Sequence, residues 1–395
     1  MRTHEPLSAS LLVPETEERH ALRTAVRGLA RSYGRAYFQS VCSAGGFPDE
    51  LWNALGSAGF LGVHIPEEHG GGGGGLADLV VVMEETAAAG CPLQMIVISP
   101  TIAGSILSHH ATEAMRREWL PGIASGRRKV AFAITEPDAG TNTHRISTTA
   151  TPDGAGGWSI SGSKHWTSGL DEADALIVVA RDAGASADGR AALSMFLVPI
   201  PSRGLSFTPI DSIVRGAERQ FVTFFDSVPV TAESLIGASG AGLAQVFAGL
   251  NPERVAAAAL AGGISLFALE RATDYARDRV VWSSPIGAHQ GVAHPLAKAY
   301  IDVQLARLMN ARAAEMIDSG LDGGEGANIA KIASADACLA ALDQAIQVHG
   351  GNGLATEYGL ADLWGIARML KTAPVSREMV LNYVAVHSLG LPKSY

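Results

Sequence analysis

The spacing of apolar residues changes period twice along this chain, and those changes constrain its fold more than any other feature. From Glu15 to about Gly126, apolar residues recur every three or four positions, as in FPDELWNALGSAGF and LADLVVVMEETAAAG, which predicts helices. From about Val130 to Val230 the apolar runs are short and are bounded by Gly, Pro and Asp, which predicts strands. From Ala241 onward the helical period returns in long stretches. The order is therefore helical, β and helical.

The two later parts can be described further. The runs WSISG, ALIVVAR, ALSMFLVPI, LSFTPI and QFVTFFDSVPV are separated by regular turn signals, so we expect an antiparallel sandwich or barrel rather than βαβ units. In the last part, Ile301, Leu305, Leu308, Met309 and Met316 share one helix face, and Ile329, Ile332, Leu339, Leu342 and Ile346 share another. Long helices with apolar faces predict a bundle. The predicted class is α+β, with domains at residues 1–128, 129–238 and 239–395.

Composition excludes several classes of protein. A formal charge of -9 without a local Lys/Arg cluster argues against a nucleic-acid surface. Apolar stretches shorter than ~18 residues argue against a membrane span, and the first twenty residues lack a signal-peptide core, so a cytoplasmic location is expected. Three widely spaced cysteines and the absence of an HExxH motif predict no disulfide framework and no metal site.

The run of six glycines from Gly70 to Gly75 formally contains GxGxxG. That fingerprint requires a strand before it, within a βαβ unit, whereas the segment upstream has a helical pattern. A flexible connection is therefore the preferred interpretation over a phosphate cradle.

Three other segments carry residues suited to chemistry, and each has a plain structural alternative. After a strand-like start, VAFAITEPDAGTNTHR places small residues and hydroxyls where backbone N–H groups can approach a phosphate or a flavin, although a polar hairpin loop fits equally. Within GSKHWTSG, Trp166 either packs in the core or lies flat against a flavin. The glycines of QVHGGNGLATEYGL either end a helix, leaving Gln347 and His349 incidental, or belong to a site.

Taken together, these segments resemble the acyl-CoA dehydrogenase family over essentially the whole chain. AITEPDAGTN is similar to the first family signature and KHWTSG to its flavin-contacting strand. RDRVVWSSPIGAHQ resembles its Arg-to-His-Gln stretch, and QVHGGNG its adenine-contacting turn. The resemblance implies a helical domain, a β domain and a four-helix bundle, with FAD as the cofactor.

The resemblance also implies a set of cofactor contacts. Phe132, Ile134, Thr135, Gly140 and Thr141 would contact the flavin ring and pyrophosphate, and Trp166 and Ser168 would lie near the isoalloxazine. Arg279, Trp282, Gln290, Gln347 and Gly351 would reach FAD across a subunit interface, and Ser376 and Glu378 lie in a stretch that also touches it. Thr141, Asn251 and Arg254 are expected at the substrate. Such shared sites imply a homo-oligomer, a dimer or a tetramer.

The catalytic base is the least conventional residue of this chain. Many family members carry a Glu where Pro374 stands here, and proline also lacks the backbone N–H that helps to polarise the thioester carbonyl in the family. A second subgroup places its Glu on a helix directly before an Arg, which matches Glu253 and Arg254. The alternative is a structural Glu–Arg pair or a helix-capping acid. Pro252 either begins a new helix capped by Asn251 or, as the continuous apolar period favours, kinks a longer one.

The expected reaction is α,β-dehydrogenation of an acyl-CoA thioester to the trans-2-enoyl-CoA. Glu253 would take the α-proton while a hydride passes to flavin N5, and an electron-transfer flavoprotein would accept the electrons. A base needs a pKa near neutrality, which burial beside an acyl chain supplies. The alternatives are a flavin-dependent oxidase or monooxygenase on the same scaffold, and a non-catalytic flavin-binding relative. The sequence does not specify the acyl chain.

Overall fold

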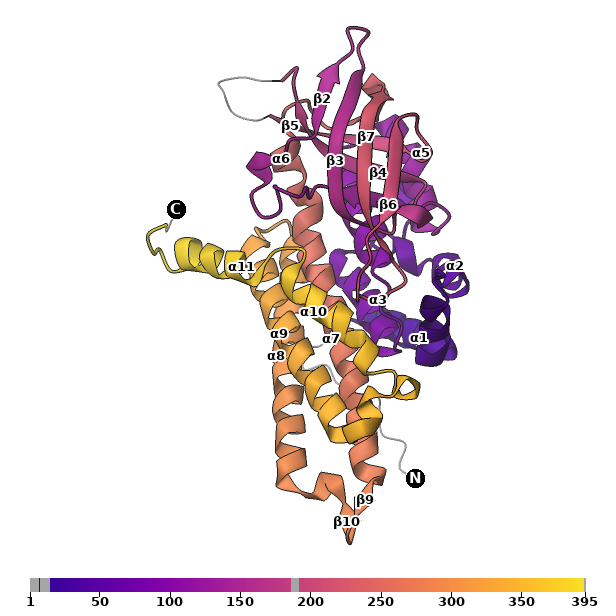
Figure 1. The fold of residues 1–395 in the computed structure, drawn as a ribbon, viewed down its shortest axis with the longest axis vertical. Coiled ribbons are helices and arrows are strands. Elements are labelled where there is room, and N and C mark those ends of the chain that lie inside the picture. Colours follow the sequence, from indigo (N-terminus) through magenta and orange to yellow (C-terminus); the bar gives the residue numbers. More distant parts are fainter. Residues whose placement is uncertain (1–6, 8–14, 186–191, 394–395) are drawn as a thin grey trace.

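The computed structural model describes residues 7, 15–185 and 192–393 of the 395-residue chain. The stretch that carries the localisation prediction, the first twenty residues, lies largely outside these. The chain forms an N-terminal helical domain, a middle β-sheet domain and a C-terminal helical domain, with the sheet at one end of the long axis and the bundle at the other (Figure 1). The predicted class and domain order are confirmed.

The N-terminal domain consists of helices joined by tight turns. They are α1 (Glu17–Ser43), α2 (Asp49–Ser57), α3 (Leu76–Ala88), a π-helical segment (Val97–Gly104), α4 (Ser105–His110) and α5 (Glu113–Ala124). Leu51, Trp52 and Leu55 on α2 are buried, as the helical spacing of their segment predicts.

The six-glycine run connects a turn at Glu67–His69 to α3, but it is not loose. The backbone N–H groups of Gly71, Gly72, Gly73 and Gly74 donate to carbonyls of Pro66, Gly62, Ile65 and Val63. A Cβ added at Gly71 would lie 2.0 Å from a backbone oxygen, so only glycine allows this close approach. The predicted connection is confirmed and its predicted flexibility is wrong. These four amides are already used internally and cannot hold a phosphate.

The middle domain is one eight-stranded sheet in the order β6-β7-β3-β2-β4-β5-β8, with β1 paired to β4. The strands are β1 (Val130–Ala133), β2 (Thr149–Pro152), β3 (Trp158–Ser168), β4 (Ala175–Asp182), β5 (Leu193–Pro199), β6 (Leu205–Pro209), β7 (Gln220–Val230) and β8 (Leu235–Ile236). All five runs singled out in the sequence form strands. The pairing is mainly antiparallel as expected, but β1 and β2 both run parallel to β4.

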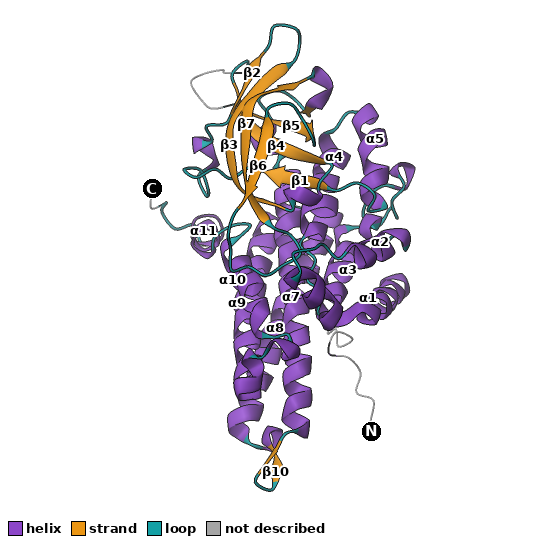
Figure 2. Ribbon diagram, turned by 45° about the vertical axis from the view of Figure 1, so that its right-hand side comes forward, coloured by secondary structure: helices purple, strands orange, loops and turns teal. Residues whose placement is uncertain are grey.

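The sheet folds over itself to enclose its own core. In Figure 2, β2, β3, β6 and β7 form a layer that crosses the direction of β1, β4 and β5. Ile160, Phe221 and Phe225 from the first layer pack with Leu176 and Phe196 from the second. The sandwich-like arrangement that the turn spacing predicts is therefore present.

The C-terminal domain is built on three long helices. After the short α6 (Gly242–Gln245) these are α7 (Phe247–Asp278), α8 (Gln290–Asp318) and α9 (Gly324–His349), followed by α10 (Trp364–Thr372) and α11 (Arg377–Tyr383). A small hairpin, β9 (Val280–Val281) with β10 (Ser284–Pro285), links α7 to α8. The segment Gly242–Asp278 contains a window of mean hydropathy 1.4, apolar and long enough to cross a bilayer, but 89% of that window is buried inside the protein. It is the central helix of the bundle.

The side chains that fill the bundle differ from those that the sequence pattern suggests. The faces of α8 and α9 that meet α7 are lined by small residues such as Ala313, Ala314, Ala337 and Ala341, which let the helix axes approach closely. Of the larger apolar residues of α8, Val303 is buried and Met309 packs against the core, whereas Ile301 and Leu305 are 52% and 60% exposed. The predicted stripe therefore faces outward, within one chain, only at Ile301 and Leu305.

A buried ionic network joins the N-terminal domain to the bundle. Glu84 on α3 accepts hydrogen bonds from Arg23 on α1 and from Arg307 on α8, each at 2.7 Å. Burial alone would raise the pKa of Glu84, but the two guanidinium groups outweigh it and lower the pKa to about 2. The carboxylate therefore stays charged and holds the three helices in one arrangement.

Candidate active site

The loop after β1 and the middle of β3 lie side by side and form a cradle. The backbone N–H of His165 donates to the carbonyl oxygen of Thr135 at 2.8 Å. The pairing of β3 with β7 shifts register between Lys164 and Thr167, and Trp166 within that shift has φ of 62°. A left-handed backbone at a tryptophan costs about 1 kcal/mol or more, and here it turns the side chain out of the sheet, where it is 51% exposed. Core packing of Trp166 is excluded.

A buried ion pair supports the cradle from below. Lys164, fully buried, donates from Nζ to Glu136 Oε1 at 2.9 Å and to the carbonyl of Ile134 at 3.0 Å. The Glu136 carboxylate also accepts from Ser147 and Thr148 of the following loop. Glu136 therefore has a structural role: its carboxylate joins the loop after β1 to Lys164 and to the loop that carries Ser147 and Thr148.

The surface of the cradle suits a flat ring with polar edges. Phe132, Ile134 and Thr135 are half-buried along it. The Ser168 hydroxyl donates to Gln220 Oε1 at 2.8 Å, which leaves the buried Nε2 of Gln220 without a partner among the described residues. In the adjoining loop, Gly140 and Thr141 are exposed, and a Cβ added at Gly140 would meet open space. An unused buried N–H, an exposed indole and an open glycine loop fit a planar heteroaromatic group carrying a phosphate tail.

Glu253 lies near the beginning of α7, a part of the helix that shares an apolar cluster with the cradle. The helix begins at Phe247 and runs through Pro252 without a break, so the continuous interpretation of this segment is correct. Val246 and Leu250, just before Glu253, belong to the same apolar cluster as Val130, Phe132 and Ile134. The first turns of α7 pack against Ile102 and Ile106, because a Cβ added at Gly249 would lie 2.9 to 3.0 Å from their side chains. The segment that carries Ile102 also contacts β1, where the N–H of Val130 donates to Ser99 Oγ at 3.0 Å. Glu253 stands one turn further along α7, half-buried.

The surroundings of Glu253 favour a proton-exchanging carboxyl. Burial raises its pKa to about 7, and the positive charges of Arg254 and Lys331 oppose the rise. Arg254 does not pair with it: its Nη1 donates instead to Asn251 Oδ1 at 2.5 Å. Among residues 15–185 and 192–393 no hydrogen bond or ion pair engages the Glu253 carboxyl. The alternative of a structural Glu–Arg ion pair is therefore not what the structure contains.

The segment around Pro374 connects α10 to α11. Lys331, on α9, donates to the carbonyl of Lys371 at 3.2 Å and makes a short hydrogen bond to the carbonyl of Val375. Ser376 caps α11, accepting from the N–H of Met379, and Glu378 is exposed in the first turn of that helix. Lys331 and Lys164 are not among the site residues predicted from the sequence. The signal for Lys331 is a lysine on the Ala/Ser/Cys face of α9, where a charged side chain has no solvent to reach.

Five of the predicted site residues lie elsewhere. Arg279, Trp282, Gln290, Gln347 and Gly351 are exposed at the end of the bundle that carries the β9–β10 hairpin, opposite the β domain (Figure 1). Trp282 is 95% exposed and has φ of 61°. Nearby, the rings of Tyr275 and His349 stack with centroids 4.3 Å apart, which ties α7 to α9. Within one chain these five residues do not contact the cradle. That they contact the cofactor of a neighbouring subunit stays a prediction.

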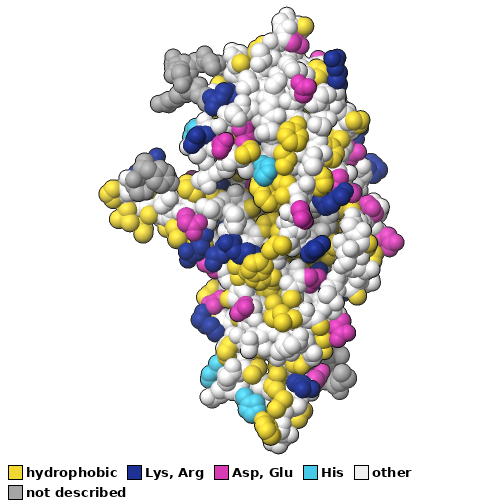
Figure 3. All heavy atoms as spheres, in the orientation of Figure 1, with side chains coloured by type: hydrophobic (Ala, Val, Ile, Leu, Met, Phe, Trp, Pro, Cys, Tyr) yellow, Lys and Arg dark blue, Asp and Glu magenta, His cyan; other side chains and the backbone are white. Residues whose placement is uncertain are grey.

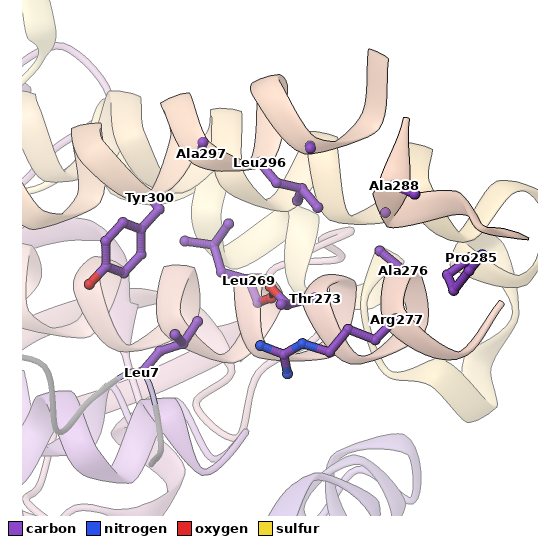
Figure 4. A pocket seen from close by; sticks show the side chains of 12 residues that line it. Leu7, Leu269, Thr273, Ala276, Arg277, Pro285, Ala288, Leu296, Ala297 and Tyr300 are labelled. Atoms are coloured by element: carbon purple, nitrogen blue, oxygen red, sulfur yellow. Dashed lines mark hydrogen bonds between the residues drawn. The ribbon is translucent and has the colours of Figure 1, made fainter. Parts of the chain in front are cut away.

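An apolar hollow of about 610 Å³ also lies toward that end of the bundle. Figure 4 shows Leu269 and Thr273 of α7 facing Leu296 and Tyr300 of α8 across it. It is separated from Glu253 by several turns of α7, so it is not the place where Glu253 acts.

Comparison with known proteins places this geometry among relatives. Three family models match in series: the acyl-CoA dehydrogenase N-terminal domain over residues 16–127, the middle domain over 131–227 and the C-terminal domain over 240–388. The acyl-CoA dehydrogenase FadE12 of Mycobacterium tuberculosis is 51% identical over 383 residues, covering 96% of this chain and 98% of that protein.

Solved structures give the same relationship in three dimensions. A glutaryl-coenzyme A dehydrogenase in complex with glutaryl-CoA superposes with a TM-score of 0.90 at 27% identity, covering 97% of this chain and 98% of the other. Butyryl-CoA dehydrogenase from Megasphaera elsdenii has the same fold, with a TM-score of 0.89 at 24% identity, covering 95% and 99%.

Proposed function

The chain belongs to the acyl-CoA dehydrogenase family, and on that premise we propose that it converts an acyl-CoA thioester to the trans-2-enoyl-CoA with Glu253 as the base. The observation that carries the proposal is the Glu253 carboxyl. It is half-buried, has no hydrogen-bond or ion-pair partner among the described residues, has a pKa raised to about 7, and lies one turn along α7 from Leu250, which shares an apolar cluster with Phe132 and Ile134 of the cradle. A carboxyl near neutrality can take a weakly acidic proton and release it again.

FAD is the cofactor of this proposal, and the cradle provides its contacts. Trp166, Ser168, Phe132, Ile134 and Thr135 would hold the ring. When bound, the flavin supplies the acceptor for the β-hydride. The open loop at Gly140 and Thr141 would hold the pyrophosphate, and the exposed residues Arg279, Trp282, Gln290, Gln347 and Gly351 would serve the cofactor of a second subunit. Ser376 and Glu378 complete the proposed set.

The protein's own part in the reaction is to deprotonate, orient and exclude water. Glu253 would take the proton from the α-carbon of the thioester. Asn251 and Arg254 lie on the same helix, and the fixed Arg254–Asn251 hydrogen bond would present a positive edge toward the substrate. Removing water around Glu253 strengthens each of these electrostatic interactions.

We further propose that an electron-transfer flavoprotein accepts the electrons and that the functional form is a homo-oligomer. The outward-facing stripe with Ile301 and Leu305 supports the second proposal, because exposed apolar faces of this kind mark interfaces. Figure 3 shows further apolar side chains gathered on the face of the molecule where α9, α10 and the projecting α11 lie.

One observation favours a second candidate, a flavin-dependent oxidase or monooxygenase. Pro374 offers no backbone N–H, so the N–H that would donate to the thioester carbonyl in other family members is missing at this position. A change in how the thioester is polarised would accompany a change in chemistry. Rapid oxygen uptake with peroxide or an oxygenated product, during turnover with acyl-CoA, would identify this alternative.

The experiment that tests the main proposal is anaerobic titration of the purified flavoprotein with short, long, branched and aromatic acyl-CoAs. At least one should bleach the flavin absorbance and give the enoyl-CoA. Glu253→Gln should keep its flavin yet lose bleaching by ~10³-fold or more. Glu270→Gln, which alters a surface acid on the same helix paired with Arg31, is the matched control and should bleach normally. Normal reduction of the Glu253→Gln protein would remove Glu253 from the mechanism.

A further inference from the structure

Lys331 is a buried cation on α9 that meets no carboxylate. Its side chain is nearly inaccessible, with the residue 2% exposed. In the part of the chain that the structure describes, no ion pair joins its Nζ to an acid. Its hydrogen bonds go instead to two backbone carbonyls, those of Lys371 and Val375. Burying an ammonium group in this way is costly unless the site needs the charge.

The two carbonyls flank Pro374: that of Lys371 lies in the last turn of α10, and that of Val375 lies on the loop between α10 and α11. On the outer side of this loop, Asp336 of α9 pairs with Lys371 at 2.7 Å and with Arg377 at 3.3 Å, and these side chains are about one-third exposed. On the buried side, Lys331 holds the same segment through its two hydrogen bonds. The segment is therefore attached to α9 on both sides, and Lys331 is the attachment whose charge acts on Glu253.

The charges around Lys331 and Glu253 can be assigned by element. Lys331 is influenced by Arg254 and Glu253 from α7, Asp336 from α9 and Glu378 from α11, and Glu253 by Arg254 and Lys331. Asp336 already pairs with Lys371 and Arg377, and Glu378 is exposed to solvent. Burial and then Arg254 lower the pKa of Lys331 to about 8, so the side chain is still mostly charged at pH 7. Among the acids that influence Lys331, Glu253 is therefore the one that is neither paired nor exposed.

We propose that Lys331 is a positioning residue of the active site: it fastens the 371–375 segment to α9 and provides a fixed positive charge that favours the carboxylate, proton-accepting form of Glu253. This inference rests on the proposed role of Glu253. It assigns to one side chain both the shape of the loop that contains Pro374 and the protonation state of the base.

The reason is electrostatic. Desolvation disfavours the carboxylate, and a base that is protonated at the working pH cannot act. A neighbouring cation, in a medium of effective dielectric near 20, stabilises a carboxylate by about one pK unit or more. Losing Lys331 would leave Arg254, among the described residues, as the cation that opposes the effect of burial on Glu253.

Three substitutions separate charge from shape. Lys331→Met removes both the charge and the donors, Lys331→Gln removes the charge but keeps an amide that can donate to a loop carbonyl, and Lys331→Arg keeps the charge. Lys371→Met is the matched control: it removes a lysine from the same segment and its surface pair with Asp336, while the backbone carbonyl that accepts from Lys331 remains. If Lys331→Met does not fold, Lys331→Gln carries the test.

Two measurements apply to each flavoprotein. The first is the pH dependence of first-turnover flavin reduction. The second needs no substrate: an infrared pH titration of the Glu253 carboxyl, taken as the difference between each protein and the same protein carrying Glu253→Gln. Lys331→Met and Lys331→Gln should each raise the acidic limb of the pH–rate profile and the infrared midpoint of Glu253 by roughly one pH unit. Lys331→Arg and Lys371→Met should leave both quantities unchanged.

An unmoved midpoint in both neutral variants would overturn the proposal. So would a shift of equal size in Lys371→Met, because the effect would then belong to net charge rather than to Lys331. These outcomes differ from failure of the proposed function, in which no acyl-CoA reduces the parent flavin or Glu253→Gln reduces normally.

Discussion

Lys164 Nζ lies 2.9 Å from Glu136 Oε1, with both side chains almost completely buried beneath the strand that turns Trp166 outward. Burial alone would raise the pKa of Glu136, but hydrogen bonds from Thr148, Lys164 and Ser147 outweigh it and lower the pKa to about 2. The pair therefore fixes the geometry of the cradle rather than taking part in proton transfer.

Glu136→Gln should destabilise the protein by about 3 kcal/mol, because it strands a buried ammonium group without its counterion. Because the pKa of Glu136 is depressed, the full difference in the free energy of unfolding between variant and parent should be present above about pH 4.5. The difference should shrink as the pH falls toward 2. Chemical denaturation across that range measures it, and flavin retention on gel filtration should fall in parallel. Glu172→Gln, which breaks the less buried pair with Lys129, should cost about 1 kcal/mol or less.

Glu253→Gln should make the folded protein more stable above neutral pH. A carboxyl with a raised pKa binds its proton more tightly when folded, so its contribution is favourable below about pH 4.5 and is lost as the pH rises through 7. The variant should gain roughly 1 to 3 kcal/mol over the parent at pH 8 and nothing near pH 4.5. Thermal unfolding at the two pH values decides this. A destabilised variant at pH 8 would mean that the carboxylate has partners in the folded protein.

Glu218→Gln should give the same stability signature without the loss of activity. Glu218 is buried, accepts from the N–H of Met95 at 2.7 Å, and has its other oxygen unpaired among the described residues. Burial raises its pKa to about 7, and a glutamine can keep the bond to Met95. A gain of about 3 kcal/mol at pH 8 is expected, vanishing near pH 4.5, with normal flavin bleaching. If bleaching were lost, Glu218 would have a catalytic part that its position does not suggest.

Trp282→Ala should lower flavin retention although Trp282 is far from the cradle of its own chain. The exposed side chain contributes little to folding, so unfolding midpoints should stay close to the parent value. Co-expression with Glu253→Gln gives the sharper result. In a mixed assembly, the chain carrying Trp282→Ala keeps its base and would borrow the tryptophan of its neighbour. The mixed assembly should therefore be more active than either variant alone, and the absence of this gain would show that the distal residues do not complete a neighbouring site.

Much of the fold follows from the apolar periods, because each period change in the sequence corresponds to a change of domain. The helical continuity through Pro252 was also predictable, since the apolar spacing on either side of it stays in phase. The parallel pairing of β1 and β2 with β4 was not, because strand neighbours far apart in sequence leave no trace in local pattern. Spacing likewise placed Ile301 and Leu305 on one face but could not say whether the partner of that face is the same chain.

For the site, the residue types were predictable and their environments were not. Nothing in the order of residues shows that Arg254 turns to Asn251 and leaves Glu253 unpaired, or that Lys331 reaches two carbonyls forty positions away. Trp166 was ambiguous for the same reason. Only the register shift in β3 decides that its ring faces outward, and a register shift has no signature in a run such as GSKHWTSG.

Helix α7 carries Glu253 near its beginning and leads directly into Arg279 at its end, over 32 residues or about 48 Å. A single-residue insertion within it would rotate everything beyond by about 100° and so turn the hairpin away from its present direction. The length of α7 can therefore change only by whole helical turns, together with matching changes in α8 and α9. Surface loops can vary in length freely, whereas the central helix fixes both the distance and the rotation between Glu253 and the hairpin.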